Sequence, residues 1–263
     1  MEGYHVMRTH PQLQQKVPVL YNGMYGMDTG GIGDPIDPNL TMLQNIEAQV
    51  EHMQLLSDGM AGMCHAKDVE SARKTIAAHG QLPEDLGQAI MHWFGMVNHQ
   101  VTEDGRARGE DTPDLNALAM TNRVNAVEYM FPHYFVLPFL SSQAAYRIRP
   151  LGPEKCSFEL WSLTLFPEGQ EPEPVMEPTV LPYDSQAFPE IPRQDYSNIP
   201  RQQIGLHADG FEFMRLSKDI EGLVSNYNRI IDGYLQGVAP EKLAHATTHL
   251  AGNFDGKIKD LGF

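Results

Sequence analysis

The hydrophobic period of the chain changes at Phe131, and this change limits the possible folds more than any other feature. Before it, apolar residues recur at steps of three and four, the period of an amphipathic α-helix, most clearly at Leu43, Ile46, Val50, Met53 and Leu56. After it, apolar and polar residues alternate, most clearly from Ser157 to Leu165, as in a strand with one buried face. Two periods in separate blocks predict a helical part followed by a sheet.

The two blocks divide into separate elements. Helices are predicted at Thr41–Leu56, Asp68–Ala78, Pro83–Thr102 and Thr112–Val127. Strands are predicted at His133–Leu140, Gln143–Pro150 and Cys156–Phe166. The intervening segment Leu151–Glu154 contains Gly and Pro, which favours an antiparallel hairpin between the last two strands.

The last third of the chain carries two further signals. Eight prolines between Pro167 and Pro200 disfavour regular structure in that stretch. The segment Ser217–Gln236 then has one continuous apolar face, which predicts a long helix that must pack on a large surface. Because the antiparallel sheet is the available surface, the predicted fold class is α+β.

Composition excludes several classes of partner. The chain has 34 acidic and 19 basic residues, so non-specific binding to nucleic acid or to an anionic membrane surface is not expected. Two cysteines, Cys64 and Cys156, do not form a disulfide framework, and the longest apolar run is broken by prolines and far too short to span a membrane. We therefore expect a cytoplasmic protein whose partners are small molecules or proteins.

The first ten residues offer candidate metal ligands, His5 and His10. Residues five apart on a regular helix point about 140° away from each other, so one ion cannot bind both from an undistorted helix. Pro11 disfavours helical backbone at His10, which makes joint ligation possible. Two imidazoles and a carboxylate form the facial triad of non-haem Fe(II) oxygenases. Other histidine pairs, His92 with His99 and His245 with His249, are interpreted as solvated residues on helix surfaces.

Several stretches, taken in order, resemble the large (alpha) subunit of Rieske-type aromatic ring-hydroxylating oxygenases. They cover essentially the whole chain: Glu2-Gly3-Tyr4-His5-Val6-Met7-Arg8-Thr9-His10-Pro11, Phe131-Pro132-His133, Tyr146-Arg147-Ile148-Arg149-Pro150-Leu151-Gly152-Pro153, Gln194-Asp195 and Gln203-Ile204-Gly205-Leu206. The resemblance implies that Fe(II) is held by His5, His10 and Asp195. It also implies that Glu2 links the iron site to a cluster histidine of a neighbouring subunit. The implied pocket residues are Tyr4, Met7, Phe131, His133 and Gln203.

The resemblance also implies a fold and a set of partners. The fold is a helix-grip (SRPBCC or START-like) domain with a helical insertion, in which a curved antiparallel sheet packs on the long C-terminal helix. Electrons would come from NAD(P)H through a reductase, with or without a ferredoxin, and then through a Rieske [2Fe–2S] cluster. The full-length assembly would be a homotrimer or an α3β3 complex.

Neither Cys64 nor Cys156 begins the C-x-H motif of a Rieske cluster. We therefore expect residues 1–263 to form a single catalytic domain whose Rieske domain is absent from this chain, and the isolated chain to be inactive. The expected reaction is cis-dihydroxylation or monooxygenation of an apolar, aromatic substrate by dioxygen. Two alternatives stay open: a metal-free helix-grip module that binds a hydrophobic ligand, and a zinc hydrolase, although no glutamate lies between the histidines as a general base.

Overall fold

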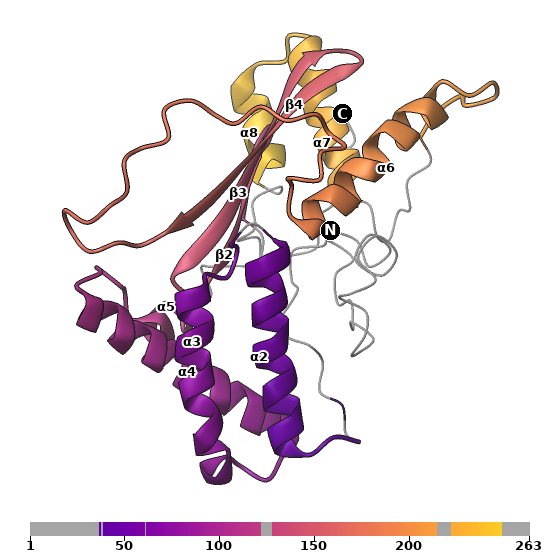
Figure 1. Cartoon of the computed structure of the whole chain (residues 1–263). Helices are drawn as coiled ribbons and strands as arrows, with labels where there is room; N and C mark the ends of the chain where they lie inside the picture. Colours follow the sequence, from indigo (N-terminus) through magenta and orange to yellow (C-terminus); the bar gives the residue numbers. More distant parts are fainter. Residues whose placement is uncertain (1–36, 38, 61, 122–127, 215–221, 249–263) are drawn as a thin grey trace.

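The computed structural model describes residues 37, 39–60, 62–121, 128–214 and 222–248. Three helices form the base of the molecule, α2 (Met42–Gly59), α3 (Ala66–Thr75) and α4 (Leu86–Arg108), with the 3-10 helix η2 (Ile76–Gln81) and the short α5 (Leu115–Ala119). The sheet rises above them, and α6 (Glu190–Leu206), α7 (Gly222–Leu235) and α8 (Pro240–Thr248) follow it in the chain (Figure 1). The predicted α+β class is confirmed.

Local capping signals place the helix ends. Thr41 and Gln44 form a reciprocal capping box before α2, in which the Gln44 amide donates to Thr41 Oγ1 (3.2 Å) and the Thr41 amide to Gln44 Oε1 (2.9 Å). Asp85 caps α4, which ends at Gly109 in the left-handed region (φ 86°). The predicted helices at 41–56, 68–78 and 83–102 are therefore confirmed, with shifted ends.

The fourth predicted helix, Thr112–Val127, is confirmed in part. Within the described residues 112–121 it forms α5 over Leu115–Ala119, where Asp114 caps its start and the Thr121 hydroxyl donates to the Leu118 carbonyl (2.7 Å) in a closing turn. Residues 122–127 lie outside the described part of the chain.

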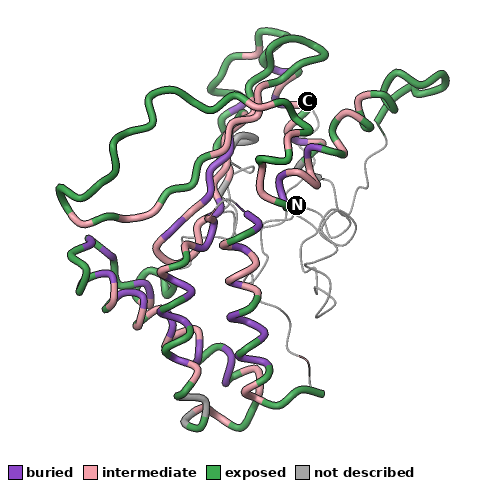
Figure 2. The backbone as a smooth tube through the Cα atoms, in the orientation of Figure 1, coloured by how far each residue is buried: buried purple, intermediate pink, exposed green. Residues whose placement is uncertain are grey.

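The sheet is a four-stranded antiparallel meander in sequence order: β1 (Glu128–Met130), β2 (Tyr134–Phe139), β3 (Ser142–Gly152) and β4 (Lys155–Thr164). The predicted hairpin is confirmed, with Tyr146 paired to Leu160 across β3 and β4 and to Phe135 on β2. Its inner face packs on α2 and α4 around the fully buried Trp93, and buried residues follow this interface (Figure 2).

Prolines did not prevent a helix in the stretch that we predicted to lack regular structure. The chain is irregular up to Pro189, but α6 then runs from Glu190 to Leu206 with Pro192 and Pro200 inside it. Pro192 is the third residue of the helix, where a backbone N–H has no partner within the helix to lose. Burial of Ile191 and Tyr196 stabilises the helix and offsets the hydrogen bond that Pro200 removes.

Part of the predicted helix Ser217–Gln236 is seen as α7. Its Ile230 is fully buried among Tyr129, Phe131 and Tyr227, so this helix packs beside β1. Residues 215–221 lie outside the described part of the chain. A helix that packs on the sheet agrees with the expectation, whereas the helix-grip arrangement stays a prediction.

Two buried carboxylates tie the helices to the sheet. Asp68 accepts hydrogen bonds from the Ser141 amide (3.2 Å) and from the hydroxyls of Ser141 (2.6 Å) and Ser142 (2.9 Å) at the β2–β3 turn. Glu110, only 4% exposed, pairs with Arg108 and with Lys67, whose ammonium also donates to the Leu165 carbonyl (2.7 Å). These contacts set the sheet against α3 and α4.

The Glu110 cluster predicts a loss of stability in acid. Burial alone would raise the pKa of Glu110, but the hydrogen bonds and charges of Arg108 and Lys67 outweigh burial and bring this pKa below its ordinary 4.5. The stabilisation is therefore present above the pKa of the unfolded chain and lost as pH falls through the lower folded value. Glu110→Gln should flatten the pH dependence of the free energy of unfolding below about pH 5 in urea titrations.

The matched control for Glu110→Gln is Glu103→Gln. Glu103 is more than half exposed and pairs with Arg106 at 3.5 Å. A surface pair of this kind contributes about 0–1 kcal/mol to stability. The control should therefore show the same pH dependence of the free energy of unfolding below about pH 5 as the wild type. If Glu110→Gln and the wild type showed the same pH dependence of the free energy of unfolding in acid, the prediction would be contradicted.

Candidate active site

The structure separates the predicted site residues into two groups. Asp195, Phe131, His133 and Gln203 are described, whereas Glu2, Tyr4, His5, Met7 and His10 lie outside the described residues. Of the predicted iron ligands, Asp195 alone lies among the described residues.

Asp195 lies on the inward face of α6. It follows the buried Ile191 by one helical turn, and residues four apart share a face. The Ile191 side chain packs at the C-terminal end of α2, where a Cβ on Gly59 would meet it at 3.5 Å. This packing sets the angle of α6 and turns Asp195, which is half-buried, toward the interior.

Aromatic rings form a continuous wall near Asp195. Phe135 on β2 stacks on Tyr146 of β3 with ring centroids 4.8 Å apart, and Tyr146 meets Phe158 of β4 edge-on at 5.6 Å. Phe158 in turn meets Tyr196 of α6 at 4.9 Å. The wall therefore runs across three strands and ends beside the carboxylate.

Two phenol hydroxyls of this wall stay protonated. Burial, followed by the neighbouring Tyr196 and Asp195, raises the pKa of Tyr146, whose hydroxyl donates to Met60 Sδ (3.5 Å). Burial, followed by the charge of Asp195, raises the pKa of Tyr196. The Tyr196 hydroxyl is buried and has no hydrogen-bond partner within the described part of the chain. It is thus an unused donor close to Asp195.

A family model described as "Ring hydroxylating alpha subunit (catalytic domain)" matches residues 1–237. The match includes all the motifs that carried the resemblance. The chain belongs to this family. No curated protein and no solved structure matches the chain significantly.

Family membership confirms the resemblance to the catalytic domain of Rieske oxygenase alpha subunits. The ring-hydroxylating domain is accordingly an oxidoreductase of a non-haem iron family whose substrates are dioxygen and aromatic compounds and whose Rieske cluster lies in another domain. An oxidoreductase family disfavours the zinc hydrolase alternative. In the described residues, no helix is long and apolar enough to cross a membrane.

The residues available to hold iron fit this chemistry. Two imidazoles and a carboxylate are the donor set that non-haem Fe(II) oxygenases use. Asp195 lies on the inward face of α6, next to Tyr196, whose buried hydroxyl has no hydrogen-bond partner within the described residues. The described residues contain no group of three or more His, Cys, Asp or Glu that could form a rival metal site. His92 and His99 are exposed on α4, in agreement with solvated side chains.

The other described candidates lie at different places in the ring-hydroxylating domain. Phe131 stacks on Tyr234 and meets Tyr227 edge-on, both with centroids 5.9 Å away, at the junction of β1 and α7. The His133 carbonyl accepts from the Ile148 amide (2.9 Å), and its side chain is half-buried. Gln203 donates to Glu154 Oε2 (2.6 Å) in the β3–β4 turn, about 12 Å along α6 from Asp195. Their roles as pocket residues stay predictions.

Sequence reasoning did not predict that Phe135, Phe158, Tyr146 and Tyr196 form one aromatic wall. Alternation along β3 and β4 does indicate which residues share a face of the sheet. It does not indicate which face meets α6, because that contact joins segments about 40 residues apart in the chain.

Proposed function

We propose that this domain inserts oxygen from dioxygen into an aromatic ring at a mononuclear Fe(II) held by His5, His10 and Asp195. The observation that carries the proposal is the inward carboxylate of Asp195 at the end of the aromatic wall formed by Phe135, Tyr146, Phe158 and Tyr196. A carboxylate beside apolar rings combines a metal ligand with a surface for a flat apolar substrate.

The residues of the chain have separable tasks in this proposal. When bound, ferrous iron supplies open coordination positions for dioxygen and substrate. The aromatic wall orients a substrate ring by stacked and edge-on contacts and excludes water from the site. Tyr196 keeps its proton because burial raises the pKa of its phenol, and its hydroxyl, which has no hydrogen-bond partner within the described residues, is a donor available to a group bound beside Asp195. A hydrogen bond from this donor would orient an oxygen-bearing group at the site.

Electron supply belongs to the same proposal. Glu2 links the iron site to a Rieske [2Fe–2S] cluster of a neighbouring subunit, and the electrons come from NAD(P)H through a reductase or ferredoxin. The functional assembly is a homotrimer or an α3β3 complex. The products are cis-dihydrodiols or monohydroxylated aromatics.

Anaerobic titration with Fe(II) tests the function directly. We expect the full chain to bind about one Fe(II) per molecule, measured by iron analysis after desalting. The nitric oxide adduct of the bound iron should give an electron paramagnetic resonance signal that changes when an aromatic compound is added. A well-folded sample prepared with iron present that binds aromatic compounds but no iron would refute the oxygenase and favour the metal-free binding module.

Tyr196→Phe tests the orphan hydroxyl. Because the hydroxyl is buried without a partner, its removal should leave the iron-free protein as stable as the wild type, or more stable by about 1 kcal/mol, in urea unfolding. The same variant should broaden or shift the signal of the iron-nitric oxide complex. Tyr183→Phe is the control, because Tyr183 is exposed. Destabilisation of the iron-free Tyr196→Phe variant, with an unchanged signal, would contradict the assignment.

A further inference from the structure

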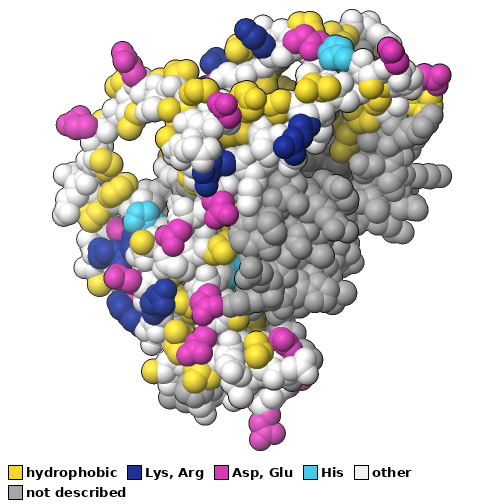
Figure 3. Space-filling view, turned by 45° about the vertical axis from the view of Figure 1, so that its right-hand side comes forward, with side chains coloured by type: hydrophobic (Ala, Val, Ile, Leu, Met, Phe, Trp, Pro, Cys, Tyr) yellow, Lys and Arg dark blue, Asp and Glu magenta, His cyan; other side chains and the backbone are white. Residues whose placement is uncertain are grey.

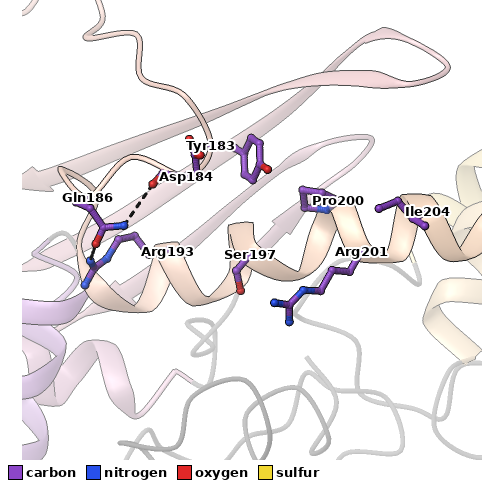
Figure 4. A pocket seen from close by; sticks show the side chains of 8 residues that line it. All are labelled: Tyr183, Asp184, Gln186, Arg193, Ser197, Pro200, Arg201 and Ile204. Atoms are coloured by element: carbon purple, nitrogen blue, oxygen red, sulfur yellow. Dashed lines mark hydrogen bonds between the residues drawn. The ribbon is translucent and has the colours of Figure 1, made fainter.

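A cavity of about 390 Å³ lies on the face of α6 that points away from Asp195. Its lining residues include Tyr183, Arg193, Ser197, Pro200, Arg201 and Ile204, and the segment 183–186 crosses above the helix to complete it (Figure 4). At about 100° per residue, Ser197 and Ile204 lie roughly 160–180° around the helix from Asp195. This cavity, the α6 pocket, therefore lies on the opposite side of α6 from Asp195.

The α6 pocket contains arginine N–H groups that have no hydrogen-bond acceptor among the described residues. The Arg193 guanidinium donates to Gln186 Oε1, but its buried Nε has no partner. The Arg201 side chain makes no ion pair or hydrogen bond within the described part of the chain. Asp184 is the one acidic residue among the lining side chains. In a chain with a net charge of −15, two arginines with spare donors in one pocket favour a carboxylate-bearing occupant.

The same chain contains an acidic segment whose charge is complementary to the arginines of the α6 pocket. Residues 168–180, the acidic arm, are exposed at every position and stand away from the sheet on the side opposite α6 (Figures 1 and 3). The arm contains four glutamates and no basic residue. Its apolar side chains Val175, Met176 and Val180 are 85–88% exposed. Prolines at 172, 174 and 178 favour an extended backbone.

We propose that the acidic arm of one copy docks in the α6 pocket of a second copy. Its glutamates meet Arg193 and Arg201, while Val175 and Met176 cover Pro200 and Ile204. Ile204 is 72% exposed and lacks a cover of its own. Each copy supplies one arm and one pocket, so the contact is head-to-tail and can close a ring. The docked arm would pack against the face of α6 opposite Asp195 and stabilise the position of this helix.

Self-association of the full chain tests this docking. Sedimentation equilibrium should show an oligomer. Arg201→Glu, and separately the triple change Glu171→Lys, Glu173→Lys and Glu177→Lys, should each weaken association by at least about tenfold, or about 1.4 kcal/mol. Combining both sets in one chain should restore part of the loss. The control is Glu70→Lys on α3, an exposed site away from both surfaces. A monomeric wild type, or equal effects of control and test variants, would overturn the proposal.

Cross-linking separates docking between copies from folding of the arm onto its own helix. Met176→Cys and Ile204→Cys are made in separate chains that also carry Cys156→Ser, since Cys156 is exposed and Cys64 is buried. Mild oxidation of the mixture should give disulfide dimers faster than either variant alone. An intramolecular disulfide in the chain with both changes, without dimers in the mixture, would overturn the proposal. Neither experiment needs iron, so a failure would not bear on the proposed iron chemistry. A monomeric wild type would also count against the proposed homotrimer or α3β3 assembly, whereas the cross-linking result bears on the arm and the α6 pocket alone.

Discussion

Asp195→Ala should remove stable iron binding from the protein. Loss of a hydrogen-bonded partner around a metal site already costs roughly 10–100-fold in affinity, and loss of a direct ligand costs more. We therefore expect the Fe(II) dissociation constant to rise by more than about 100-fold. The change should leave the fold intact, because Ile191 and Tyr196, rather than Asp195, anchor α6 in the core. Iron analysis of desalted protein and circular dichroism measure the two outcomes.

Asp209→Ala is the matched control for Asp195→Ala. Asp209 is exposed beyond the end of α6, in the same acidic part of the chain. The control should bind about one Fe(II), as the wild type should. His5→Ala and His10→Ala should lose iron like Asp195→Ala if all three residues hold one ion. Full iron content in Asp195→Ala, or equal loss in Asp209→Ala, would show that α6 does not supply the ligand.

Gly105→Ala should destabilise the fold by about 1–3 kcal/mol, the typical cost of overpacking. A Cβ on Gly105 of α4 would lie 2.1 Å from Thr112 Oγ1, 3.0 Å from Thr112 Cβ and 3.1 Å from Glu110 Oε2. Because the chain turns back after Gly109 to bury Glu110, its backbone cannot move away without breaking the pairs with Lys67 and Arg108. Urea unfolding followed by circular dichroism measures the loss.

The same helix offers a control of opposite sign. Gly95 is also inside α4, but the nearest atom to a Cβ there is Asn116 Oδ1 at 3.8 Å, an ordinary contact. Gly95→Ala should therefore stabilise the protein by about 0.5–1 kcal/mol, the usual difference between Gly and Ala within a helix. If both variants changed the stability equally, the close approach of Thr112 to Gly105 would not be the cause.

Short-range signals were reliable for the elements whose ends are capped locally. The capping box at Thr41 and Gln44 and the alternation in β3 and β4 use residues within a few positions of one another, so the sequence carries the complete information. The same reasoning failed at α6. Its prolines are unfavourable locally, whereas the burial of Ile191 and Tyr196 that stabilises the helix comes from distant parts of the chain.

By itself the sequence determined the α+β class, the order of most elements and, through its motifs, the family to which the chain belongs. Only the tertiary structure decided that Asp195 stands on the buried face of a helix, beside rings from three strands, with the α6 pocket behind it. The physical reason is the separation along the chain of the residues that interact. Capping and periodicity act between neighbours in the chain, whereas the direction in which Asp195 points depends on how Ile191 and Tyr196 pack against α2 and β4.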